Sequence, residues 1–129
     1  MFRLVVLVFM FMSPSVALAQ DDDPLLQYKW LKRPLVIFAD SADDPRFIRQ
    51  MELLQVNPED LEARDVVILT DVDAASDTDL RNTLHPRDFM LVLIAKDGNI
   101  ALRKPTPWTV RELSRAIDKM PLRQDELQK

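Results

Sequence analysis

The sequence contains no cysteine and only one glycine, Gly98, among its 129 residues. A cysteine thiolate is the nucleophile of every thiol–disulfide exchange, so this chain cannot catalyse that chemistry. Without disulfides, the fold depends on its hydrophobic core alone. A single glycine also excludes the glycine-rich loops that bind phosphate groups. Thiol-redox enzymes and nucleotide-binding proteins of that type are therefore excluded.

The sequence also has fewer positively than negatively charged residues. Lys and Arg total 17 against 21 Asp and Glu, which gives a net charge of −4 at pH 7. Nucleic acids and anionic membrane surfaces repel a protein of this charge. We therefore expect neither of them as a partner.

The first 19 residues have the pattern of a secretory signal peptide. Arg3 supplies the positive charge, residues 4–12 are apolar, and Ala17-Leu18-Ala19 offers a cleavage site of small residues. The apolar stretch is shorter than the roughly 20 residues that span a bilayer. We expect cleavage after Ala19 and a periplasmic or secreted product with no membrane attachment. An uncleaved anchor is the alternative.

The remaining chain is predicted to form one small domain. Residues 20–27 are expected to form a flexible acidic lead, residues 28–124 the domain, and residues 125–129 a C-terminal tail. Apolar runs predict strands at 35–39, 66–69 and 89–95, and the Asp97-Gly98 turn predicts a hairpin that returns at 100–103.

Capping residues indicate where the helices begin. Such starts are found at Asp44-Pro45, at Asn57-Pro58, at Ser76 with Asp79, and at Thr109 with Glu112. Pro121 is expected to limit the last helix. The resulting order is β-α-β-α-β-β-α, which predicts an α/β protein with a four-stranded mixed sheet flanked by helices on both faces. This is the order of a thioredoxin-like fold.

Four motifs carry a resemblance to a known family. They are Tyr28-x-Trp30-x-x-Arg33-Pro34-Leu35, Arg64-Asp65-Val66-Val67, Lys96-Asp97-Gly98 with Arg103, and Ile117-Asp118-x-Met120-Pro121-x-Arg123-Gln124. Together they resemble a thioredoxin-like domain-of-unknown-function family, over Leu26–Leu127. That family occurs as small exported bacterial proteins and as modules of extracellular proteins, including sushi-repeat-containing proteins and Equarin. It has no established activity, so the resemblance implies a fold and export but no reaction.

The wider thioredoxin resemblance stops at the catalytic features. The positions of the two cysteines and the residues between them are taken by Asp43-Asp44-Pro45-Arg46, and Met90 stands where thioredoxins place a cis-proline before a strand. Neither Asp nor Arg can replace a thiolate as the nucleophile. We therefore expect no oxidoreductase activity.

One edge of the predicted sheet gathers acidic residues, because the carboxyl ends of parallel strands meet there. This acidic edge should contain Asp40, Ser41, Asp43, Asp44, Asp71, Asp73, His85, Arg87, Asp88, Arg103 and Lys104. One interpretation is a thiol-independent enzyme, hydrolytic or metal-assisted, that uses Asp40, Asp71 and His85. The other is solvated loop, since Asp71-x-Asp73 lacks the glycine and final glutamate of a calcium loop. We expect the second, with no metal and no cofactor.

The opposite edge gathers most of the family-like motifs. The candidate binding residues are Arg64, Lys96, Asp97, Asp118 and Arg123, with Arg103 as a sixth at the acidic edge. They could form an ion-pair network that holds the C-terminal segment, or a surface that recognises a partner. We expect the first role for Asp118 and Arg123, and exposed partner contacts for Arg64 and Lys96. The sequence thus favours a non-catalytic binding or interaction module for an unknown protein or small ligand of the cell envelope.

Overall fold

The computed structural model describes residues 23–129. The predicted signal peptide at 1–19, its cleavage site and the start of the acidic lead lie outside these residues. Within 23–129, no helix is long and apolar enough to cross a membrane. The elements are η1 (a 3-10 helix, Leu26–Tyr28), β1 (Arg33–Phe38), α1 (Pro45–Leu54), α2 (Pro58–Glu62), β2 (Val66–Asp71), α3 (Asp79–Leu84), β3 (Met90–Ile94), β4 (Ile100–Lys104), α4 (Val110–Asp118) and α5 (Pro121–Leu127).

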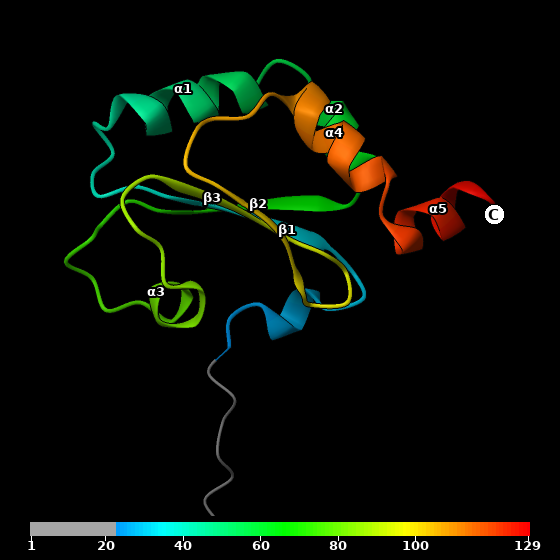
Figure 1. The fold of residues 1–129 in the computed structure, drawn as a ribbon, viewed down its shortest axis with the longest axis horizontal. Coiled ribbons are helices and arrows are strands. Elements are labelled where there is room, and N and C mark those ends of the chain that lie inside the picture. The colour runs from blue at the N-terminus through cyan, green and yellow to red at the C-terminus, as the bar shows by residue number, and fades with distance from the viewer. Residues whose placement is uncertain (1–22) are drawn as a thin grey trace, which may run out of the picture.

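The four strands form one mixed sheet in the order β2-β1-β3-β4. β1 pairs in parallel with β2 and antiparallel with β3, and β3 pairs antiparallel with β4. Every residue of β1 is buried because the strand is central and covered on both faces. Figure 1 shows α1, α2 and α4 on one side of the sheet and α3 with the N-terminal segment on the other. The predicted fold class is confirmed.

Two hydrophobic cores lie on the two faces of the sheet. Alternate residues of β1 face opposite sides, so Leu35 and Ile37 join the core under α1, α2 and α4, whereas Val36 and Phe38 join the core under α3. This alternation explains why the sequence of β1 is apolar without interruption after its first residue.

The helix starts follow the predicted positions at α1, α2 and α4, although Asn57 makes no side-chain capping hydrogen bond at the start of α2. The Asp44 side chain accepts from the Arg46 N–H at 2.9 Å at the start of α1, and Thr109 and Glu112 form the capping box of α4. The prediction of Ser76 as the cap of α3 is wrong. Thr78 caps it instead, because Thr78 directly precedes the first turn and its hydroxyl accepts from the Arg81 N–H.

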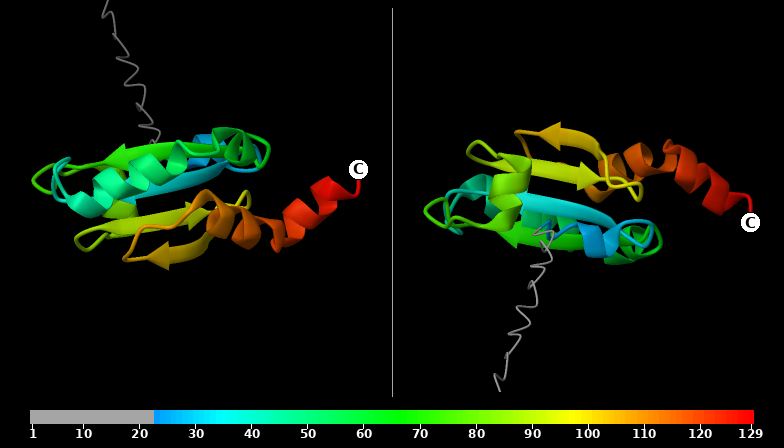
Figure 2. Two further views of the ribbon diagram at one scale, coloured as in Figure 1. Left: turned by 90° about the horizontal axis from the view of Figure 1, so that it is seen from above. Right: turned by 90° about the horizontal axis from the view of Figure 1, so that it is seen from below.

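Pro121 ends α4, as predicted, but it also begins α5. Proline is suited to the first helical position, since its missing N–H would have no partner there. Residues 125–127, expected in a C-terminal tail, are therefore helical. α5 buries no residue of its own and projects from α4 to one side of the molecule, as Figure 2 shows. Its attachment must therefore depend on side-chain pairing.

Candidate functional site

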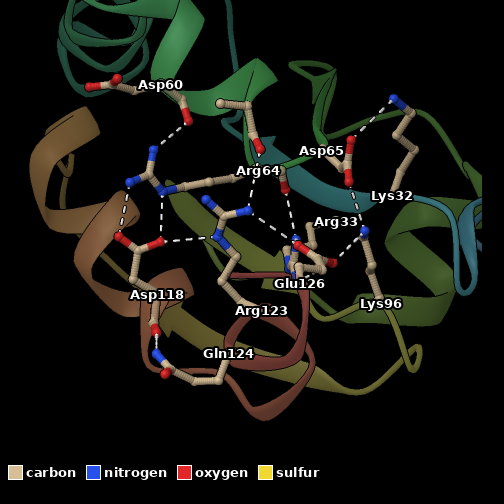
Figure 3. Close-up of polar contacts among 11 residues, drawn as sticks. Lys32, Arg33, Asp60, Arg64, Asp65, Lys96, Asp118, Arg123, Gln124 and Glu126 are labelled. Carbon is tan, nitrogen blue, oxygen red and sulfur yellow. Dashed lines mark hydrogen bonds and ion pairs between the residues drawn. The ribbon is translucent and has the colours of Figure 1, made fainter. Parts of the chain in front are cut away.

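The amino end of β1 holds the most extensive group of paired charges in the described chain. This charged cluster consists of Lys32, Arg33, Arg64, Asp65, Lys96, Asp118, Arg123 and Glu126, and Figure 3 shows its contacts. Its members come from the start of β1, the turn before β2, the β3–β4 hairpin, the end of α4, and α5. The cluster therefore joins segments that are distant in the sequence.

Arg33 lies at the centre of the charged cluster. It opens β1, and its side chain is only 1% exposed. Its guanidinium donates to both Glu126 carboxylate oxygens, at 3.4 and 3.1 Å, and to the Arg64 carbonyl oxygen at 2.8 Å. The Arg33 Nε is buried and has no hydrogen-bond partner. A buried arginine needs a counterion, and Glu126 supplies it.

Lys96 bridges two carboxylates in the charged cluster. Its Nζ lies 2.7 Å from Asp65 Oδ2 and 2.6 Å from Glu126 Oε1. Burial lowers the pKa of Lys96, but hydrogen bonds to Asp65 and Glu126 outweigh it and raise the pKa above its usual value. Burial likewise raises the pKa of Glu126, yet the hydrogen bonds from Lys96 and Arg33 bring it down to about 2. The ionised forms of both groups are thus strongly favoured.

Asp118 receives two arginines. Arg64 approaches it side-on, with both N···O distances at 2.9 Å, and Arg123 Nε lies 3.2 Å from Oδ1. The hydrogen bond from Arg64 lowers the pKa of Asp118 more than burial raises it. Arg123 thus ties α5 to the end of α4, and Glu126 ties the same helix to Arg33 and Lys96 at the centre of the cluster.

The structure brings together four of the six candidate residues, Arg64, Lys96, Asp118 and Arg123. Asp97 lies in the adjacent hairpin turn and accepts only from Asn99. Arg103 lies on β4 near Met90, away from the others. The prediction that Arg64 and Lys96 stay exposed is wrong. Their side chains are only 17% and 12% exposed, because both are enclosed by acidic partners.

Two important residues of this region escaped the sequence reasoning. Glu126 was placed in the tail, and no local pattern pairs it with Arg33, which is 93 residues away. Trp30 lies beside the cluster and is 61% exposed, with its backbone in the left-handed region at φ 69°. Its N–H donates to the Lys96 carbonyl oxygen at 2.6 Å. Its position between two lysines in a family-like motif was the available signal.

The acidic edge is divided into two separate groups of paired charges. In the first, Arg46 lies 2.8 Å from Asp44 and 2.6 Å from Asp88. The hydrogen bonds from Arg46 lower the pKa of both carboxyl groups. The hollow beside α1 is lined by Asp40, Ser41, Asp43, Asp44, Pro45, Arg46 and Asp88, and includes neither Asp71 nor His85.

Asp71 belongs to the second group. Its carboxylate accepts from the Thr78 hydroxyl at 2.6 Å and from Arg81 Nε at 2.9 Å. Burial raises the pKa of Asp71, but these hydrogen bonds bring it below its usual value. His85 is exposed and ends α3 with a left-handed backbone at φ 50°. Among residues 23–129, no three His, Cys, Asp or Glu side chains are grouped so that they could hold a metal ion.

The fold and these two edges define an α/β protein of thioredoxin-like architecture with no cysteine at the position of the redox pair. Two solved structures are similar to it over most of both chains. The reduced 2-Cys peroxiredoxin of Plasmodium vivax shares 16% identity at a TM-score of 0.56, over 81% of this chain and 85% of its own. Mycobacterium tuberculosis AhpC shares 17% at a TM-score of 0.55, over 78% and 74%. At these identities the likeness concerns the fold alone.

Residues 24–126 match the family model described as "Domain of unknown function (DUF4174)". The chain belongs to this family, which confirms the expected membership of a domain-of-unknown-function family. A comparison with curated protein sequences gives no match.

Proposed function

We propose that the protein is an exported, non-catalytic binding module built on a thioredoxin-like scaffold. It acts in the periplasm or outside the cell after signal-peptide cleavage, and its partner is a protein or small ligand of the cell envelope, not a nucleic acid. The resemblance to small exported bacterial proteins and to modules of sushi-repeat-containing proteins and Equarin supports this location. The net negative charge supports the exclusion of nucleic acid.

The observation that carries the proposal is the presentation of Trp30. A left-handed backbone conformation costs a tryptophan about 1 kcal/mol or more, since its Cβ crowds the following carbonyl oxygen. Here the conformation places a 61% exposed indole beside Leu31, which is 66% exposed. Backbone strain of this kind is concentrated at functional sites, and exposed tryptophans are frequent anchors of binding surfaces.

The helix that follows the redox loop in thioredoxins supports the same conclusion. Asp44 caps α1 and its second carboxylate oxygen pairs with Arg46, so the residues at this position stabilise the helix start. The chain has no thiol that could act there. A binding role requires the thioredoxin-like scaffold but not thiol–disulfide exchange.

The proposal is tested by affinity capture from a cell-envelope extract with the mature protein as bait. Trp30→Ala should abolish capture of the partner while the melting temperature stays within about 2 °C of wild type. Val56→Ala is the matched control, since Val56 is 69% exposed and lies after α1. Capture that survives Trp30→Ala, or reproducible insulin reduction or peroxide consumption by the purified protein, would overturn the proposal.

A further inference from the structure

We propose that Arg33 and Lys96 form a carboxylate-binding recess that Glu126 of α5 fills in the free protein, and that the carboxylate of a ligand replaces Glu126 when the module binds. This inference rests on the proposed binding function and names the chemistry that the site recognises.

The recess has the geometry of an anion-binding site. Two cations from β1 and the β3–β4 hairpin converge on the Glu126 carboxylate, with N···O distances of 3.1 Å from Arg33 and 2.6 Å from Lys96. Their side chains are 1% and 12% exposed, so water screens their charges poorly. Arg123, on α5 itself, adds a contact at 3.3 Å and moves with the helix. The pKa of Glu126, held at about 2, reflects the strength of this attraction.

Arg33 is the residue that most needs an anion beside it. Its side chain is 1% exposed, its Nε has no partner, and Glu126 is its only acidic partner in the described chain. A buried guanidinium that loses its counterion is strongly destabilising. Whenever Glu126 leaves, another anion is favoured in its place.

Glu126 lies on α5, a short helix that can detach from the rest of the fold. α5 has seven residues, buries none of them, and no side chain caps its start. Isolated helices of this length are not stable in water. The charged cluster holds five cations and three carboxylates, and loss of Glu126 leaves five against two. α5 therefore has little stability of its own, and a competing anion needs to replace only the ion pairs that hold it.

The geometry selects a carboxylate as the ligand group. Both terminal nitrogens of Arg33 donate to the two oxygens of one carboxylate, an arrangement that matches a planar, two-oxygen acid. A hollow of about 290 Å³ adjoins the recess and is lined by Trp30, Lys96, Leu122, Asp125, Glu126 and Lys129. Of these residues, Trp30 and Lys96 lie outside the C-terminal segment and stay beside the recess when α5 moves. The carboxylate can come from an acidic peptide or from a small polycarboxylate.

The test uses the full mature chain with Glu126→Gln, which keeps the size of the side chain and removes its charge. Two probes are added in turn, citrate and a synthetic peptide of residues 121–129. At about a hundredfold excess over Kd, each effective probe should raise the melting temperature of Glu126→Gln by about 5 °C or more, and that of wild type by less, because Glu126 competes for the recess. A peptide with Gln at position 126 and sodium chloride at equal ionic strength are the negative controls.

The matched control variant is Glu52→Gln, the same chemical change at an exposed carboxylate on α1 that pairs only weakly with Arg49. It should melt as wild type does and respond to each probe as wild type does. Fluorescence supplies a second readout: in a Trp108→Phe background, Trp30 emission should shift saturably as the probe displaces α5 from the adjoining hollow.

A response to citrate alone identifies a small polycarboxylate as the source, and a response to the peptide alone identifies an acidic segment. If neither probe stabilises Glu126→Gln, the recess does not bind carboxylates and the inference is overturned. That result leaves the binding module itself untouched, because the Trp30→Ala capture experiment decides the module independently.

Discussion

The two ends of the sheet neutralise their charged side chains in different ways. At the acidic edge, Arg46 pairs with Asp44 two residues away and with Asp88 42 residues away, and Asp71 pairs with Arg81 ten residues away, in two unconnected groups. In the charged cluster, the pairs span 31, 54 and 93 residues and are continuous through Glu126 and Arg123. The first arrangement shapes individual loops and helix starts. The second attaches the C-terminal helix to the first strand.

The largest effect expected from this comparison is the loss of Arg33. Arg33→Ala should lower the free energy of unfolding by about 3–5 kcal/mol, because it leaves a cavity and removes a buried ion-pair partner. Arg46→Ala at the acidic edge should change stability little, since the Arg46 side chain is 40% exposed. Urea denaturation of both variants measures the difference. Equal losses of unfolding free energy in the two variants would contradict the predicted difference between the charged cluster and the acidic edge.

The next effect concerns the attachment of α5. Asp118→Ala and Arg123→Ala should each cost about 1–2 kcal/mol and make the chain after Met120 sensitive to protease, because both hold α5 against α4. Arg49→Ala is the control, since its pair with Glu52 is about 60% exposed on both sides. Limited proteolysis followed by mass spectrometry measures the cleavage. Wild-type protease resistance in both variants would contradict the role of the cluster as an attachment.

A pH series sharpens the comparison within the cluster. The pKa of Glu126 is about 2 in the folded chain and 4.5 ordinarily, so its ionised form stabilises the fold above pH 4.5. That contribution is lost as the pH falls from about 4.5 to about 2. Glu126→Gln should therefore cost about 1–2 kcal/mol at pH 7, allowing for the 27% exposure of the side chain, and almost nothing near pH 2. Chemical denaturation at each pH measures the stability difference between wild type and Glu126→Gln. If that difference stays constant from pH 7 to about pH 2, the ionised Glu126 carboxylate does not stabilise the fold.

The smallest effect is expected at the acidic edge. Millimolar Ca²⁺ or Mg²⁺ should leave the melting temperature unchanged, because Arg46 and Arg81 already neutralise Asp44, Asp88 and Asp71. A cation present at about 100 times its Kd would stabilise the fold by about 2.7 kcal/mol. A rise of several degrees that disappears in Asp71→Asn would establish a metal site and reverse the comparison.

Local signals predicted the fold well. The apolar runs gave the strands, and the side chains of Asp44 and Thr109 cap α1 and α4 as their spacing indicated. Prediction failed where two local candidates competed, as with Ser76 and Thr78. It also failed at α5, because a proline both ends one helix and begins another, and Met120 supplies no side-chain cap.

The site was only partly predictable. Topology brings Arg64, Lys96, Asp118 and Arg123 to one edge, and the sequence pattern was sufficient to place them there. The burial of Lys96 could not be predicted, because its partner Glu126 lies on a helix that the sequence pattern does not indicate. Trp30 is unpredictable for a different reason: no local residue requires its left-handed backbone conformation.

The separation of 93 residues between Arg33 and Glu126 also orders events during synthesis. At about 5–20 residues per second, roughly 5–19 s pass between the translation of the two residues. During that interval, burying β1 would enclose a guanidinium without its counterion, which disfavours early collapse of the sheet. The sheet can therefore bury Arg33 together with its counterion only after α5 has been translated.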